Sequence, residues 1–169
     1  MKRLALAILA VMVLACGAGT ALAAATEVKK VSASFTMSSA TCSNLPSGTT
    51  IEGTGTGTSV TSVSIDANGI TTVMNTTHYN GTATDGVNTY RFNYSNHYRI
   101  SNTGPTDPIL SGIMVDSFSL AGDGPVRLHN GFRAVFTFDS STEQARFEEL
   151  SSRGDPIDFD TGAAHCDPL

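Results

Sequence analysis

The chain has few long charged side chains in its central part. Lysine is absent after Lys30, and no glutamate lies between Glu52 and Glu143. Threonine, serine, asparagine and glycine take their place, and such a composition favours extended strands joined by tight turns. This absence argues against a helical domain and predicts an all-β one.

The common catalytic and metal-binding motifs are also absent. The sequence contains no G-x-S-x-G turn, no H-E-x-x-H and no C-x-x-C. The glycines at 53, 55 and 57 do not have the G-x-G-x-x-G spacing of a nucleotide loop. The stretch Asp158–Gly162 lacks the closing glutamate of a calcium loop, so a solvated acidic tail is expected there. We therefore expect no metal and no cofactor, and no motif supports catalysis.

Basic residues are too few for a partner with many negative charges. The formal net charge is −5, and it becomes −7 when Lys2 and Arg3 are removed with the N-terminal segment. An acidic surface disfavours nucleic acid and anionic membranes as partners.

The first 25 residues, Met1 to Ala25, have the organisation of an export signal. Lys2 and Arg3 precede an apolar stretch of 11 residues, Leu4 to Leu14, and small residues ending in an A-x-A site follow. The apolar stretch is too short to span a bilayer, so no integral membrane span is expected. The segment is typical of bacterial signals and predicts a secreted or extracytoplasmic protein.

The chain has three cysteines, and removal of the signal would leave two of them. Cys16 lies within the signal, which leaves Cys42 and Cys166. Two cysteines in an oxidising compartment most simply pair with each other. Such a disulfide would stabilise the domain by about 4–5 kcal/mol in the chain-entropy model; two buried free thiols are the alternative.

Cys16 allows a second interpretation of the N-terminal segment. Val13-Leu14-Ala15-Cys16 loosely matches a lipoprotein signal, in which the cysteine becomes the lipid-modified N-terminus. The domain would then be tethered to a membrane.

Alternating apolar and polar residues predict six to eight long antiparallel strands in one domain, residues 26–169, with an irregular tail at 153–169. Asp85-Gly86 predicts a two-residue hairpin, and Asn130-Gly131 a bulge within one long strand. A last strand is expected within residues 139–152, with a short helix as the alternative. Strands of this length favour a β-barrel, with a β-sandwich as the alternative. The expected strands lie at 26–36, 49–65, 70–84, 89–100, 109–120 and 126–138.

The candidate ligand-binding residues lie on the polar faces of two of these strands. If the strands are neighbours, their arginines and histidines form a positive stripe suited to a carboxylate or phosphate. An ordinary solvated face is the alternative. A histidine of this set could also pair with Asp116 for acid–base chemistry. The six residues are Arg91, His97, Arg99, Arg127, His129 and Arg133.

These observations favour a non-catalytic module that binds a small anionic or amphipathic molecule. A barrel enzyme of cyclase or isomerase type and a structural protein of the cell envelope are the alternatives. The sequence does not indicate an oligomeric state.

Overall fold

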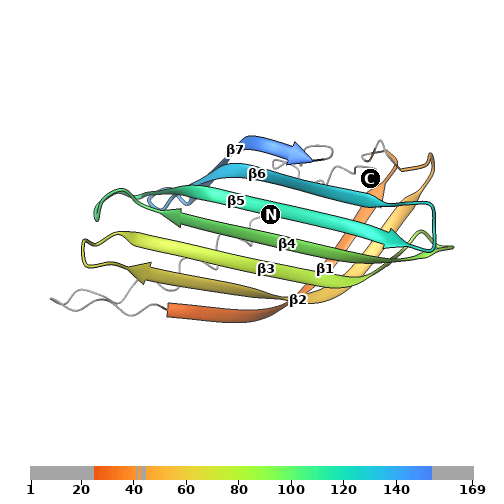
Figure 1. The fold of residues 1–169 in the computed structure, drawn as a ribbon, viewed down its shortest axis with the longest axis horizontal. Helices are drawn as coiled ribbons and strands as arrows, with labels where there is room; N and C mark the ends of the chain where they lie inside the picture. The colour runs from red at the N-terminus through yellow and green to blue at the C-terminus, as the bar shows by residue number, and fades with distance from the viewer. Residues whose placement is uncertain (1–24, 41, 43–44, 154–169) are drawn as a thin grey trace.

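Seven antiparallel strands form one sheet in the computed structural model, which describes residues 25–40, 42 and 45–153 (Figure 1). Each strand pairs with the next along the chain, in the order β1-β2-β3-β4-β5-β6-β7. The strands are β1 (Ala25–Ser38), β2 (Thr50–Ile65), β3 (Thr71–Thr84), β4 (Thr89–Ser101), β5 (Ile109–Gly122), β6 (Leu128–Asp139) and β7 (Gln144–Arg153).

The predicted all-β meander is confirmed, including the last strand, β7, where a helix was the alternative. The described residues contain no helix, and hence no helical membrane span. The sheet is not closed, because β1 and β7 each have a single neighbour within the described chain. It is nevertheless strongly curved, with one concave and one convex face (Figure 1).

Glycines on the concave face of β2 allow this curvature. β1 and β2 both bend along their length, so that half of their hairpin crosses the ends of other strands (Figure 1). The ring of Phe35 occupies the space that a Cβ atom at Gly53, its register partner, would need. A Cβ atom at Gly55 would lie 2.2 Å from the backbone oxygen of Asn80 on β3. Only a residue without Cβ permits so close an approach of two backbones.

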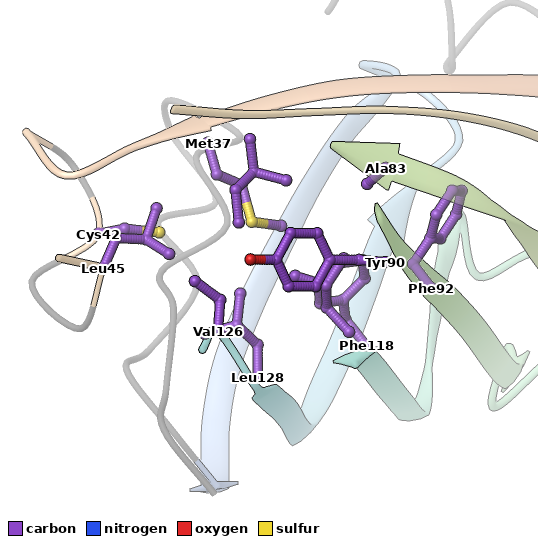
Figure 2. Close-up of a cluster of buried hydrophobic side chains, with 11 residues drawn as sticks. Met37, Cys42, Leu45, Ala83, Tyr90, Phe92, Phe118, Val126 and Leu128 are labelled. Atoms are coloured by element: carbon purple, nitrogen blue, oxygen red, sulfur yellow. The ribbon is translucent and has the colours of Figure 1, made fainter. Parts of the chain in front are cut away.

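The bent hairpin covers half of the concave face and completes a first core there. Phe35 of β1 meets Phe92 of β4 and Phe118 of β5 edge-on, with ring centroids 4.9 and 5.5 Å apart. Since β1 and β5 are not neighbours in the sheet, this contact spans the concavity. Figure 2 shows the cluster around Tyr90. Its buried members are Met37, Cys42, Leu45, Ile51, Ala83, Tyr90, Phe92, Phe118, Leu120, Val126 and Leu128.

A second core occupies the other half of the concave face. Tyr98 of β4 packs edge-on against Phe136 of β6 at 5.2 Å, and Phe136 stacks on Phe147 of β7 at 4.9 Å. Full burial of an aromatic or aliphatic side chain contributes about 1.5–3 kcal/mol. The buried members are Val73, Ile100, Leu110, Met114, Phe132, Ala134, Phe136 and Phe138.

The β3–β4 connection is longer than the two residues predicted. Thr84 pairs with Thr89, so four residues connect the strands. The Asp85 carboxylate organises them: its Oδ1 accepts from the backbone N–H of Asn88 at 2.6 Å, and its Oδ2 from the Tyr90 hydroxyl at 2.7 Å. Hydrogen bonds hold the pKa of Asp85 well below its ordinary value, and the one from the Asn88 side chain has the largest effect. The Asp85 carboxylate thus accepts from donors that would otherwise be unpaired in this connection. A two-residue turn would not provide this arrangement.

The single long strand predicted through Asn130-Gly131 is confirmed, but the bulge predicted at these two residues is wrong. β6 continues through both residues and keeps an unbroken register with β5, from Leu120↔Leu128 to Ile109↔Asp139. The irregularity lies instead on the opposite side of β6, where the register with β7 shifts between Arg133 and Ala134. The edge strand thus absorbs the extra residue, as bulges commonly do at sheet edges.

Several predictions lie outside the described residues. These are the signal segment up to Ala24, the lipidation candidate Cys16, and the irregular tail after Arg153 with its acidic stretch Asp158–Gly162 and Cys166. Cys42 is fully buried in the first core. Its pairing with Cys166 stays a prediction.

Substitution of Gly55 by alanine should destabilise the fold by about 1–3 kcal/mol, as overpacking does in other proteins. The added methyl group would meet the Asn80 backbone oxygen and the Phe92 ring. Urea unfolding monitored by circular dichroism measures the loss. Gly104→Ala is the matched control, since a Cβ atom there meets nothing within 4 Å. Equal midpoints for the two variants would contradict the role of Gly55.

Candidate functional site

The six residues predicted to bind a ligand do not form one continuous stripe. Arg91, His97 and Arg99 lie on the convex face of β4, and His129 and Arg133 on the same face of β6. β5 separates the two groups, which places them about 10 Å apart at ordinary strand spacing. Arg127 precedes β6. All are exposed except His129, which is half-buried. Their assignment to a ligand stays a prediction.

The predicted pairing of a histidine with Asp116 is wrong. Asp116 points to the concave face, as do its buried strand neighbours Met114 and Phe118, whereas His97 and His129 point to the convex face. His97 instead contacts the Thr76 hydroxyl, with 2.9 Å between Nδ1 and Oγ1. The sheet itself therefore separates the groups of the proposed acid–base pair.

A row of polar residues crosses the concave face between the two cores. Strand register aligns Lys29 with Ser59, Ser59 with Thr77, Thr77 with Asn96, and Asn96 with Asp116. We call these five residues, with their polar neighbours Glu27, Thr61, Asn75, Tyr94 and Asn130, the inner polar row.

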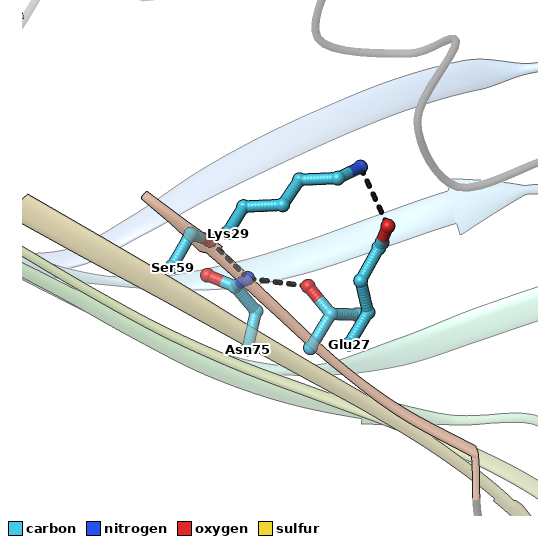
Figure 3. A network of polar contacts seen from close by, with 5 residues as sticks. Glu27, Lys29, Ser59 and Asn75 are labelled. Atoms are coloured by element: carbon cyan, nitrogen blue, oxygen red, sulfur yellow. Dashed lines mark hydrogen bonds and ion pairs between the residues drawn. The ribbon is translucent and has the colours of Figure 1, made fainter. Parts of the chain in front are cut away.

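The β1–β3 part of the inner polar row is satisfied by its own contacts (Figure 3). Asn75 donates to the hydroxyls of Ser59 and Thr61 at 3.0 and 2.8 Å. Lys29 forms an ion pair with Glu27 at 3.1 Å. This part therefore needs nothing further to explain its polarity.

The β4–β6 part is not satisfied. Asp116 Oδ2 accepts hydrogen bonds from the Tyr94 hydroxyl at 2.5 Å and the Asn96 amide at 3.0 Å. Asp116 Oδ1 and both side-chain polar atoms of Asn130 are buried without a hydrogen-bond partner among the described residues. The two side chains are only 5% and 2% exposed. A buried polar group without a partner costs about 1–3 kcal/mol.

Burial also sets the ionisation of this part. It raises the pKa of Asp116, and the hydrogen bonds from Tyr94 and Asn96 oppose that rise. Burial and the adjacent Asp116 charge raise the pKa of Tyr94 far above its ordinary value, so Tyr94 stays a neutral donor. Asp116 thus has one oxygen that accepts two hydrogen bonds and one buried oxygen without a donor among the described residues.

Two depressions on the described surface lie away from Asp116. One of about 470 Å³ borders the bend of β1 and β2, and one of about 150 Å³ lies beside β7. No group of three or more histidine, cysteine or acidic residues within the described chain could hold a metal ion.

Comparisons with known proteins identify no relative. No family model, curated protein or solved structure matches the chain.

Replacing Asp116 by asparagine should stabilise the unliganded protein at neutral pH. A raised pKa in the folded state means that Asp116 contributes stability below about pH 4 and that this contribution is lost as the pH rises through the folded pKa. The asparagine carbonyl can keep accepting from Tyr94 and Asn96 without the buried charge. We expect a higher unfolding midpoint at pH 7, and a smaller difference from wild type below pH ~4.

Thermal unfolding across this pH range measures the effect. Asp123→Asn, in the exposed β5–β6 turn, is the control and should leave the midpoint unchanged. A variant at 116 that is less stable than wild type at pH 7 would show that the carboxylate is a structural group.

Proposed function

We propose that this chain is an exported, barrel-like β domain that binds a small amphipathic molecule on its concave face without transforming it. The observation that carries the proposal is the set of buried, unpartnered polar atoms of Asp116 and Asn130 between two apolar cores. A ligand that supplied the missing hydrogen bonds would remove the cost of burying them.

The two cores explain why the ligand would be amphipathic. The polar atoms of Asp116 and Asn130 lie next to Phe118 and Phe132 in the register of β5 and β6. A ligand that reaches them must place its remaining surface against aromatic and aliphatic side chains. Sites of this composition, mainly apolar with a few polar groups, are typical of small-molecule binding.

The curvature of the sheet supports a barrel-like enclosure. The contact of Phe35 with Phe118 across the concavity has the geometry of side chains that fill a small barrel. Small barrels of this kind can hold one small ligand. The β-sandwich alternative has less support, because all seven strands belong to one continuous sheet.

Binding is favoured over catalysis by the positions of the histidines. The cyclase or isomerase alternative needs an acid–base pair, and the convex-face histidines lie on the other side of the sheet from Asp116. An anion bound by the convex-face arginines is the second candidate ligand. Its support is weaker, because β5 separates the two basic groups. No contact within the described residues specifically supports the alternative of a structural protein of the cell envelope.

Titration with an uncharged amphipathic dye, N-phenyl-1-naphthylamine, tests the location of the site. We expect its fluorescence to rise on binding to the purified protein. Asn130→Leu, similar in volume but without polar atoms, should weaken binding about threefold to tenfold through the loss of one hydrogen bond. Arg99→Ala on the convex face is the control and should bind like wild type. Weakened binding in the arginine variant alone would place the site on the convex face, and the absence of any binding would contradict the proposal.

Intact mass of the exported protein tests the compartment. We expect the chain to begin just after the A-x-A site at residues 21–23 and to lack the two thiol hydrogens of Cys42 and Cys166. A chain that begins with a lipid-modified Cys16 would instead indicate a tethered protein. A mass that retains residues 1–23 would contradict export by this signal.

A further inference from the structure

The concave face has one buried acidic side chain without an ion-pair partner among the described residues. Glu27 and Lys29 neutralise each other. Glu149 of β7, the register partner of Ala134, also lies on this face but is exposed. The buried Asp116 contacts only the neutral donors Tyr94 and Asn96 within the described chain. A buried carboxylate without a counter-charge is costly, and a cation that approaches it recovers that cost.

The unpartnered atoms are mostly acceptors. They are Asp116 Oδ1, Asn130 Oδ1 and one donor, Asn130 Nδ2. Asn130 lies diagonally across the β5–β6 pair from Asp116, because Asp116 aligns with Phe132 and Asn130 with Phe118. Diagonal neighbours are about 7–8 Å apart at their Cα atoms, so one small group can reach both side chains. An ammonium group has several N–H donors and no acceptor, so it can satisfy the two acceptors of this set.

Aromatic rings surround the same position. Phe118 and Phe132 are the register partners of Asn130 and Asp116, and the Tyr79 and Tyr94 rings lie 5.6 Å apart beside them. The face of an aromatic ring attracts an organic cation, more strongly where water is excluded. The acidic chain as a whole, with a net charge of −5, also attracts cations and repels anions.

We propose that the unsatisfied end of the inner polar row selects a small organic amine in its ammonium form, with an apolar body. This proposal rests on the proposed function. The ammonium donates to Asp116 Oδ1 and Asn130 Oδ1, and the apolar body packs against Phe118 and Phe132. A carboxylate or phosphate of the same size is excluded, because it would face the Asp116 charge.

Three phenethyl compounds of matched size test the proposal: phenethylamine, phenethyl alcohol and phenylacetate. Binding is measured by ligand-observed NMR on the purified protein at neutral pH. We expect the amine to bind about tenfold or more tightly than the alcohol, as a charge-assisted hydrogen bond in a buried site implies. Phenylacetate should bind least.

Asp116→Asn separates the charge from the shape of the site. The variant should lose about tenfold in affinity for the amine and keep its affinity for the alcohol within about twofold. Asp123→Asn, which changes the net charge by the same amount on an exposed turn, should bind the amine like wild type. Unfolding midpoints of both variants confirm that each is folded.

The outcomes distinguish this inference from the proposed function. Equal affinity for the amine and the alcohol, or an Asp116→Asn variant that binds the amine as wild type does, would overturn the amine selectivity while the dye still binds. Preference for phenylacetate would overturn it and indicate the convex-face arginines. Failure of all three compounds would overturn this inference, and failure of the dye as well would overturn the binding function itself.

Discussion

The close approach of β2 to its neighbours at Gly53 and Gly55 is the constraint on which the rest of the structure depends. Without Cβ atoms at these positions, the ring of Phe35 lies over one glycine and the β3 backbone lies against the other. The hairpin of β1 and β2 can then bend across the concave face, where Phe35 reaches Phe92 and Phe118. A sheet with side chains at these sites would stay flatter, and the first core would lose one of its walls.

Curvature also creates the interior in which the inner polar row lies. The concave face carries two apolar cores, and the polar row crosses between them by strand register. On β1–β3 the row forms its own hydrogen bonds and an ion pair, whereas at Asp116 and Asn130 it does not. The same face therefore contains polar residues with a structural explanation and polar residues without one. That contrast, more than burial alone, distinguishes the candidate site.

Most of the fold could be predicted because strand alternation is a local signal. Side chains of successive residues point to opposite faces, so the apolar face of β4 follows from the spacing of Tyr90, Phe92 and Ile100. The contact of Phe35 on β1 with Phe118 on β5 could not be predicted in this way, since it joins residues far apart in the sequence. The connection after Thr84 was also longer than its Asp-Gly pair suggested, because the Asp85 side chain organises four residues.

The site was harder to predict, although its signal is present in the sequence. Asp116 and Asn130 have the spacing of apolar neighbours such as Phe118 and Phe132, which marks them as polar residues on an inward face. The ligand-binding residues predicted from the sequence are arginines and histidines of the opposite, convex face, where charged residues are ordinary, and their role stays a prediction. An inward polar residue is the stronger signal, because burial makes its hydrogen bonds obligatory and its charge costly. A pattern cannot show whether those bonds are made, since Asn75 and Asn130 have the same inward position and only the first is satisfied. Three-dimensional contacts separate an inward polar residue that is satisfied within the sheet from one that is not.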